Sequence, residues 1–309
     1  MASVRVTIDG RDTEVSAGVS ILDAAHEAGI EIPHLCHHPG LTPAGICRLC
    51  LVEVGGKLVT ACREEVQPGM KVVTQTEELC QLRRLVLELI LSDHPQDCLT
   101  CDENGACPLQ RYAYEYGIED NRFLGPDHER RWVPAREDNP FIRYESEKCI
   151  LCGRCVRACA EIQGRYVLDF AGRGFSTRVA PPLGKSLTET NCEFCGQCVA
   201  VCPTGALAEK GRRFQGREWE LRRVRTVCPF CGCGCPITLH LKGDRIVKVS
   251  GGTEGFRLCV KGRFGIGFVH HEDRLRAPLV RNGDALRETR WEDALSLVAR
   301  RLTEIVERH

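Results

Sequence analysis

Twenty-one cysteines occur in this chain of 309 residues, and most of them lie in short, regularly spaced groups. A disulfide scaffold is excluded because such scaffolds are much smaller than this chain, and an odd number of cysteines cannot all pair within it. The N-terminal residues show no secretory signal, so we expect a cytoplasmic protein whose thiols stay reduced. Grouped thiols in a reducing compartment indicate metal centres.

Charge and hydropathy exclude two classes of protein. The 42 basic and 42 acidic side chains cancel to a net charge of zero, whereas a general nucleic-acid binder is expected to be basic. The longest apolar stretches are short, and the one from Leu85 to Leu91 is interrupted by Glu88, so we expect no transmembrane segment. The length allows two or more domains with a sizeable buried core.

Two runs with the spacing C-x2-C-x2-C-x3-C give the strongest motif. In such a pair, the first three thiolates of each run hold one cubane and the fourth binds the neighbouring cluster. The spacing therefore predicts two [4Fe–4S] clusters with exchanged fourth ligands. A zinc-stapled domain is the alternative, but it does not explain four short-spaced cysteines occurring twice. The predicted ligand sets are Cys149, Cys152, Cys155 and Cys202, and Cys192, Cys195, Cys198 and Cys159.

The first cysteine group has a different spacing, which favours a flat [2Fe–2S] cluster held by a long loop and one later segment. The loop over residues 33–50 contains small residues that allow close approach of the backbone to sulfur. Three histidines in this loop, His34, His37 and His38, are expected to pack or form hydrogen bonds rather than bind metal. The predicted ligands are Cys36, Cys47, Cys50 and Cys62.

The remaining cysteines predict two further [4Fe–4S] clusters, one of them with a histidine ligand; the alternative there is a capping histidine beside free cysteines. Cys80 lies in a helical pattern over residues 76–91, with Leu79, Leu82, Leu85, Val86 and Leu89 at helical spacing, and is expected to be buried. Cys233 either packs beside a cluster or replaces a neighbouring ligand. The two predicted sets are His94, Cys98, Cys101 and Cys107, and Cys228, Cys231, Cys235 and Cys259.

Several of these motifs carry a family resemblance. Residues 1 to about 215 resemble the large subunit of respiratory complex I and the related subunits of NAD-linked hydrogenases and formate dehydrogenases. Residues 224–276 resemble the [4Fe–4S] domain at the start of molybdopterin oxidoreductases. The segments that carry the resemblance are IPHLCHHPGL, GICRLC, HPQDCLTCDENGACPLQ, KCILCGRCVRAC and CEFCGQCVAVCPTGAL in the first part, and CPFCGCGC and LCVKGR in the second.

The resemblance implies an α+β multidomain fold. Its predicted parts are a β-grasp [2Fe–2S] ferredoxin-like domain (1–78), a helical domain with the histidine-ligated cluster (79–140), a double-cubane ferredoxin-like domain (141–215), a molybdopterin-oxidoreductase-type [4Fe–4S] domain (224–277) and a helical tail (278–309). Local patterns predict a strand at 4–8 and helices at 20–28 and 291–308. The last helix has one apolar face, which we expect to dock on the body or on a partner. The basic segment 210–225 is expected to be a solvated connector.

The implied function is electron transfer within an oxidoreductase complex. The resemblance implies a flavoprotein subunit that reacts with NAD(H) or NADP(H), and a hydrogenase or formate dehydrogenase subunit as catalytic partner; it also allows a small thioredoxin-like [2Fe–2S] subunit and electron bifurcation. No substrate site, catalytic residue, flavin, NAD or molybdopterin is expected here, because no G-x-G-x-x-G follows a strand and the chain ends about one helix after Trp291. Lys261 matches a lysine that lies between cluster and pterin in the molybdopterin family; we expect a surface or cluster-neighbouring cation. The alternatives are a truncated molybdopterin formate dehydrogenase-like enzyme and a zinc-stapled scaffold without redox activity.

Overall fold

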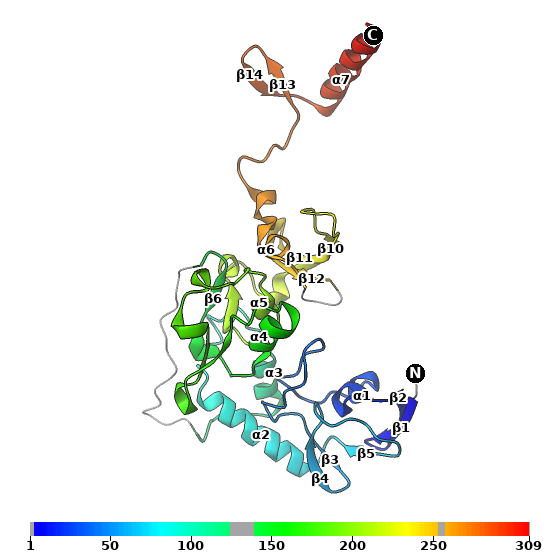
Figure 1. Ribbon diagram of the computed structural model, residues 1–309, viewed down its shortest axis with the longest axis vertical. Coiled ribbons are helices and arrows are strands. Elements are labelled where there is room, and N and C mark those ends of the chain that lie inside the picture. Colours follow the sequence, from blue (N-terminus) through cyan, green and yellow to red (C-terminus); the bar gives the residue numbers. More distant parts are fainter. Residues whose placement is uncertain (1–2, 124–138, 253–256, 309) are drawn as a thin grey trace. The chain divides into compact units, whose positions relative to one another are not determined.

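The computed structural model describes residues 3–123, 139–252 and 257–308 (Figure 1). The chain divides into two compact units, Met1–Gly265 and Ile266–His309, and each is described by itself. Within the described residues, no helix combines the length and the apolar character needed to cross a bilayer. All the cysteines belong to the first unit.

The first unit begins with a five-stranded sheet in the order β2-β1-β5-β3-β4. Strands β1 and β5 are parallel and the other pairs are antiparallel. The predicted strand and helix are both present. Strand β1 turns into β2 through Asp9 and Gly10. Helix α1 begins after Ser20, whose hydroxyl accepts a hydrogen bond from the Asp23 N–H at 3.1 Å. The elements are β1 (Ser3–Ile8), β2 (Arg11–Ser16), α1 (Ile21–Glu27), β3 (Leu51–Val54), β4 (Lys57–Thr60) and β5 (Lys71–Val73).

Two helices follow the sheet, α2 (Glu77–Ser92) and α3 (Pro108–Glu115). Helix α2 lies where its periodicity predicts, but its buried face differs: Leu89 is 50% exposed, whereas Arg83 and Glu88 are buried. These charges tolerate burial because they are paired. Arg83 donates to the carbonyl oxygens of Leu51 at 2.6 Å and Thr74 at 2.8 Å, and Arg122 donates to Glu88. Cys80 is partly buried.

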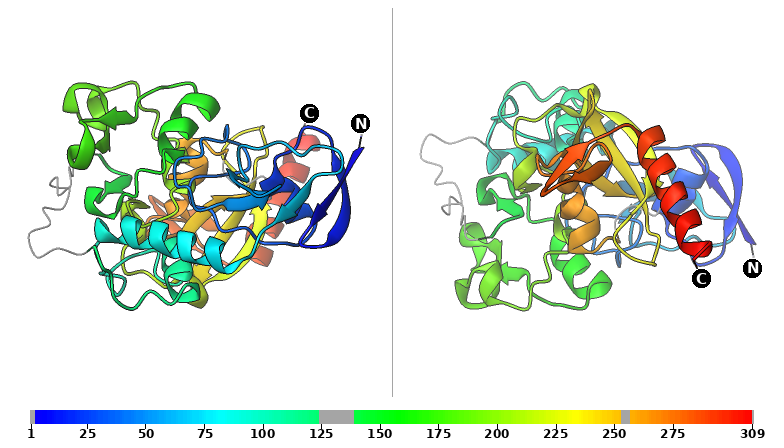
Figure 2. Two further views of the ribbon diagram at one scale, coloured as in Figure 1. Left: turned by 90° about the horizontal axis from the view of Figure 1, so that it is seen from below. Right: turned by 90° about the horizontal axis from the view of Figure 1, so that it is seen from above.

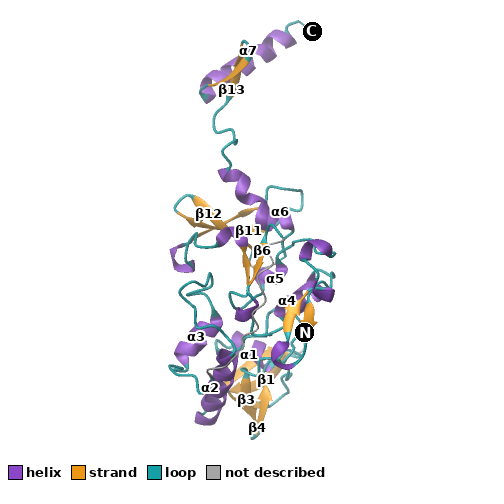
Figure 3. Cartoon of the chain, turned by 90° about the vertical axis from the view of Figure 1, so that its left-hand side faces the viewer, coloured by secondary structure: helices purple, strands orange, loops and turns teal. Residues whose placement is uncertain are grey.

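The middle of the unit consists mainly of loops and short helical turns (Figure 3). Two small antiparallel sheets, β6 with β9 and β7 with β8, stabilise it. A π-helical turn, Ala158–Ile162, continues α4. The elements are β6 (Ile142–Tyr144), α4 (Arg154–Arg157), β7 (Asp169–Ala171), β8 (Arg178–Ala180), α5 (Gln197–Ala200) and β9 (Leu207–Glu209), with 3-10 turns at Ser146–Lys148, Gly174–Ser176, Pro182–Gly184, Leu187–Glu189, Lys210–Arg212 and Glu218–Glu220.

The basic segment 210–225 is a solvated connector only in part, since Arg213, Arg222, Arg223 and Arg225 are exposed. Arg212 differs from the expectation: it is only 4% exposed, and its guanidinium forms ion pairs with Glu103 at 2.5 Å and Glu218 at 3.0 Å. This side chain tolerates burial because two carboxylates face it. The first unit ends with a three-stranded antiparallel sheet and a short helix: β10 (Arg222–Val227), β11 (Pro236–Lys242), β12 (Arg245–Gly251) and α6 (Val260–Phe264).

The second unit consists of a hairpin, β13 (Leu279–Asn282) with β14 (Ala285–Glu288), and helix α7 (Trp291–Val306), drawn from orange to red in Figure 2. A 3-10 turn, Gly265–His270, precedes the hairpin. The predicted terminal helix is therefore present. No residue of α7 is buried, and Leu295 and Leu302 are 61% and 57% exposed. Docking of its apolar face stays a prediction.

Candidate metal centres

The first cysteine group converges beside strands β3 and β4, which lie between Cys50 and Cys62 in the chain. Cys36, Cys50 and Cys62 are buried and Cys47 is partly buried. The thiols of Cys47 and Cys62 beside Cys36 hold the pKa of Cys36 far below its usual range, and the Cys62 thiol lowers the pKa of Cys50. Backbone N–H groups point at sulfur, from Leu35 to Cys47 Sγ at 3.5 Å and from Cys47 to Cys36 Sγ at 3.4 Å. The loop is therefore shaped around four thiols.

The histidines of this loop make the contacts that the sequence predicts for packing residues. His34 Nδ1 lies 2.9 Å from the Ile32 carbonyl oxygen, and His37 Nε2 lies 3.4 Å from Asp23 Oδ1. The two rings meet edge to face, with centroids 5.4 Å apart. Burial lowers the pKa of all three histidines, that of His38 to about 4, so they are neutral at pH 7.

The second group lines a cavity of about 270 Å³, to which His94, Cys98, Cys101 and Cys107 all contribute. His94 Nδ1 lies 2.9 Å from the Pro95 carbonyl oxygen; a proton donated there leaves the lone pair of Nε2 for a metal. Burial raises the pKa of Cys107 to about 12. A metal cation in the cavity would replace the thiol proton, because it supplies the missing positive charge.

The two cubane motifs fold alike although their sequences differ between the cysteines. Leu151 and Phe194 occupy equivalent positions and have φ of 52° and 51°, and the glycines two residues later, Gly153 and Gly196, have φ of 69° and 70°. Each glycine begins a short helix, α4 or α5. Left-handed backbone at two equivalent positions is costly for leucine and phenylalanine, and it wraps both loops in the same way.

The fourth cysteine of each run lies with the other run, in the two sets that the spacing predicts. The thiols of Cys149, Cys152 and Cys202 each raise the pKa of Cys155, and a small cavity is lined by all four. Cys159 likewise raises the pKa of Cys192, Cys195 and Cys198. Cys159 Sγ accepts the Val167 N–H at 3.3 Å, and Cys192 Sγ accepts the Phe194 N–H at 3.4 Å. Their assignment as iron ligands stays a prediction.

The last group lies between β10, β11 and α6. Cys228 is buried and its N–H donates to the Cys235 carbonyl oxygen at 2.9 Å, while Cys231 and Cys259 are exposed. Hydrogen bonds from the Cys233 backbone N–H and from the Cys233 thiol lower the pKa of Cys231, as does the nearby Lys261 ammonium. The structure thus brings the unassigned Cys233 to this centre together with the four predicted ligands.

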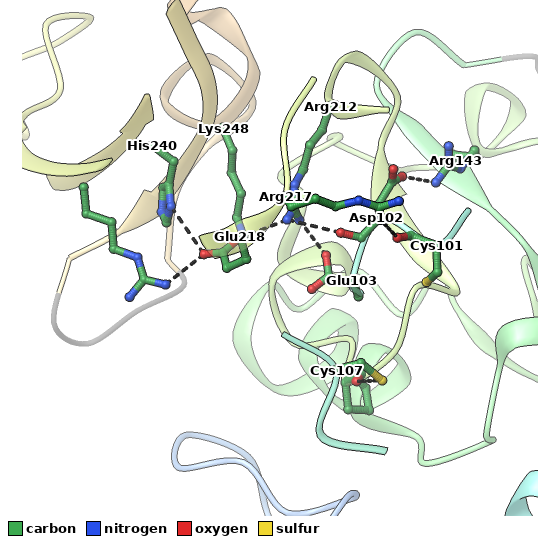
Figure 4. Close-up of polar contacts among 12 residues, drawn as sticks. Cys101, Asp102, Glu103, Cys107, Arg143, Arg212, Arg217, Glu218, His240 and Lys248 are labelled. Atoms are coloured by element: carbon green, nitrogen blue, oxygen red, sulfur yellow. Dashed lines mark hydrogen bonds and ion pairs between the residues drawn. The ribbon is translucent and has the colours of Figure 1, made fainter. Parts of the chain in front are cut away.

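Basic side chains that sequence reasoning did not assign lie beside Cys101 and Asp102 in the second group (Figure 4). Arg217 donates to the Cys101 carbonyl oxygen at 2.5 Å, and Arg143 forms an ion pair with Asp102. Burial raises the pKa of Cys98 and Cys101, and Lys148, which lines the cavity, opposes this shift. For Arg217, the signal in the sequence was the run of seven basic residues between 210 and 225.

The residues of these groups fit iron–sulfur clusters. Their donors are thiols and one imidazole, several sulfurs accept N–H bonds, and two of the sets line cavities. A zinc ion instead needs its ligands within about 2.3 Å of one point. Within residues 3–123, 139–252 and 257–308, no three His, Cys, Asp or Glu side chains are arranged around one metal ion.

Four family models match segments of the chain between residues 1 and 271. They are described as 2Fe-2S iron-sulfur cluster binding domain (residues 1–77), NADH-ubiquinone oxidoreductase-G iron-sulfur binding region (83–122), NADH-quinone oxidoreductase subunit 3, ferredoxin-like domain (139–208), and Molybdopterin oxidoreductase Fe4S4 domain (221–271). They indicate one 2Fe-2S region and several 4Fe-4S regions in the chain.

Similar proteins belong to several redox complexes. The chain is 40% identical to the NADPH-Fe(3+) oxidoreductase subunit alpha of Geobacter sulfurreducens, over 99% of this chain and 36% of that protein. It is 35% identical to the mitochondrial NADH-ubiquinone oxidoreductase 78 kDa subunit of Candida albicans, over 97% and 42%, and 32% identical to the putative formate dehydrogenase YrhE of Bacillus subtilis, over 99% and 36%. It therefore spans well under half the length of these curated relatives.

A solved structure covers most of the first unit. One chain of the crystal structure of an NAD+-reducing [NiFe]-hydrogenase in the H2-reduced state matches with a TM-score of 0.64 and 34% identity, over 70% of this chain and 91% of that chain. The chain belongs to the family of iron–sulfur subunits that includes the large subunit of complex I, formate dehydrogenase-like proteins and subunits of NAD+-reducing hydrogenases.

Proposed function

We propose that this chain is an electron-transfer subunit that carries one [2Fe–2S] and four [4Fe–4S] clusters between a flavoprotein that reacts with NAD(H) or NADP(H) and a catalytic hydrogenase or formate dehydrogenase subunit. The observation that carries the proposal is that the five ligand sets are linked by direct contacts. Clusters bound to these sets would supply one-electron transfer, and linked sets would form one conducting path.

The first two links involve the cubane set of Cys149. Arg157 donates to the carbonyl oxygen of Cys36, in the first set, at 2.6 Å and lies 3.5 Å from that of Cys152. The residues after Cys202 then form part of the wall around the set of His94, since Cys107 Sγ donates to the Pro203 carbonyl oxygen at 3.6 Å.

Two further links complete the path. The two cubane sets exchange Cys159 and Cys202, so each run of cysteines contributes one thiol to the other set. Arg263, four residues after Cys259, donates from Nε to the Cys195 carbonyl oxygen at 3.0 Å, which connects the last set to the second cubane set. The protein's own part in electron transfer is to hold these sets in place, to bury them and to direct N–H groups and cations toward sulfur.

The partner proposal is supported by the relatives' names. They include proteins described as NADPH-linked, NADH-linked and NAD+-reducing, and both a hydrogenase and a putative formate dehydrogenase. We propose a cytoplasmic complex in which a flavoprotein, with or without a small thioredoxin-like [2Fe–2S] subunit, exchanges electrons with this chain.

Iron and sulfide content tests the cluster proposal directly. The chain, purified and reconstituted under anaerobic conditions, is expected to be brown and to contain about 18 iron atoms with matching acid-labile sulfide. Cys62→Ser should lose the [2Fe–2S] signal in electron paramagnetic resonance (EPR), whereas Cys80→Ser should keep every signal. Stoichiometric zinc without sulfide would establish the scaffold alternative instead.

Purification of the native complex tests the partners. A tagged chain expressed in its source cells should bring with it a flavin-containing subunit and a second subunit with nickel or molybdenum. Flavin without either metal would contradict the catalytic partner, and recovery of the chain alone at full cluster content would contradict the whole assembly.

A further inference from the structure

We propose that Arg154 is an electrostatic positioning residue shared by two centres, and that its partly buried guanidinium raises the reduction potentials of the cluster at Cys36 and of the cluster at Cys149 together. The inference rests on the proposed function, because it requires clusters at both ligand sets. Arg154 lies between Cys152 and Cys155 in the first cubane motif, and it is not one of the predicted ligands.

The loop before Arg154 packs directly on the first cysteine group. A Cβ atom on Gly153 would lie 3.2 Å from Ile46 Cδ1, next in sequence to Cys47, which is tighter than ordinary van der Waals contact. Ile150 from the same loop packs on the buried core that contains Leu35 and Leu49. The two ligand loops are therefore in contact at two positions just before Arg154.

Arg157 fixes the two loops at one separation. Besides the carbonyl oxygens of Cys36 and Cys152, its guanidinium donates to the carbonyl oxygen of Thr42 in the first loop. Residues three apart lie on the same side of a helix, so Arg154 is held on this side of α4 (Arg154–Arg157) by the neighbouring clamp.

Arg154 is partly buried, and thiols of both sets lie near its guanidinium. Burial lowers the pKa of the guanidinium, and the thiols that oppose this effect are Cys152 and Cys202 from one set and Cys36 and Cys47 from the other. Its Nε atom is buried and has no hydrogen-bond partner, and in the part of the chain that the structure describes Arg154 forms no ion pair with a carboxylate. The negative charge near this cation therefore comes from the thiols of the two sets.

A partly buried cation acts on both centres because charges interact over longer distances where water is partly excluded. Reduction adds one negative charge to a cluster, and a nearby guanidinium stabilises that charge. Neutralising Arg154 should therefore make reduction harder at both centres, whereas the three sets that do not face it should keep their potentials.

The test compares Arg154→Gln with Arg154→Lys, and with Arg173→Gln, which removes the same charge from an exposed position of the same domain. In EPR-monitored redox titrations, Arg154→Gln should lower the reduced-to-oxidised ratio of both centres at a fixed potential by roughly tenfold, about 59 mV for one electron. Arg154→Lys should retain most of the wild-type ratio, and Arg173→Gln all of it.

The outcomes separate the inference from the proposed function. Wild-type protein without clusters would overturn the function. Two results would overturn only the inference, provided that the wild-type protein has its clusters. In the first, the Arg154→Gln variant has full iron and unchanged potentials; in the second, it has full iron and an equal shift at all five centres. If Arg154→Gln does not bind its iron but Arg154→Lys does, the result supports a requirement for the positive charge. If neither variant binds iron, the result contradicts that requirement.

Discussion

Gly205 lies against the sulfur of Cys101: a Cβ atom added to this glycine would be 2.4 Å from Cys101 Sγ. Gly205 follows Cys202, which belongs to the first cubane set, whereas Cys101 belongs to the set of His94. The segment that supplies Cys202 to the first cubane set thus also forms part of the wall around the set of His94. A change in that segment should therefore act on a cluster whose ligands are about a hundred residues away in sequence.

Gly205→Ala should remove the cluster at the His94 set, because the added methyl group has to displace Cys101 Sγ from the cavity. We expect the loss of about four iron atoms per chain, measured by iron and sulfide content together with EPR. Gly211→Ala is the matched control, since a Cβ atom there meets nothing within 4 Å. Full iron content in the Gly205 variant would show that Cys101 is not a ligand.

Replacing His94 by cysteine should shift the potential of this centre to a more negative value. The neutral imidazole becomes a thiolate, so the cluster carries one more negative charge and its reduction is less favourable. His34→Gln is the control, because His34 lies beside the first set and is hydrogen-bonded to Ile32. A titration in which His94→Cys leaves the potential unchanged would contradict ligation by His94.

The cysteine spacing predicted which thiols would meet because ligand sets are local patterns. The exchange of Cys159 and Cys202 follows from the length of the C-x3-C step, and the structure places both cysteines with the opposite run. Helix α2 and the β1–β2 turn were likewise visible as periodicity and as the Asp9-Gly10 pair. Each of these predictions starts from a pattern of residues close in sequence, and the exchange then needs only that two such runs meet.

The paired charges could not be predicted, because their partners are distant in sequence. Glu103 lies 109 residues before Arg212, and no local pattern relates the two. The same holds for Arg83, which bonds the backbone oxygens of Leu51 and Thr74. Composition predicted a solvated side chain for Arg212, and helical periodicity predicted that only apolar residues of α2 would be buried, which left out Arg83. In both cases hydrogen bonds to distant residues stabilise the buried side chain.

Arg212→Ala should destabilise the protein strongly, by about 3 kcal/mol, because it leaves Glu103 partly buried without its partner and removes the buried cation beside Glu218. Arg223→Ala removes a cation from the same Glu218, at 2.8 Å, but its side chain is 63% exposed, so we expect less than about 1 kcal/mol. Denaturant unfolding of the reconstituted protein measures both. Equal effects of the two variants would contradict a structural role of the buried pair.

Glu209 on β9 should make the stability of the protein decrease as the pH rises. Burial raises the pKa of its carboxyl to about 7, although the nearby cations Arg263, Lys248 and Arg212 oppose the shift. The model-peptide value is 4.5. Between these two values the folded state holds a proton that the unfolded state has lost, so the free energy of unfolding falls through this window, by about 3 kcal/mol when the ionisation is complete.

Glu209→Gln should remove this contribution, because the amide stays neutral at every pH. Relative to wild type, the variant should gain stability steadily from about pH 5 to about pH 7, as measured by denaturant unfolding at constant ionic strength. Glu119→Gln replaces an exposed carboxylate and should keep the wild-type profile. Parallel wild-type and Glu209→Gln profiles would mean that this carboxyl is already ionised in the folded protein, with Arg263 or Lys248 as its partner.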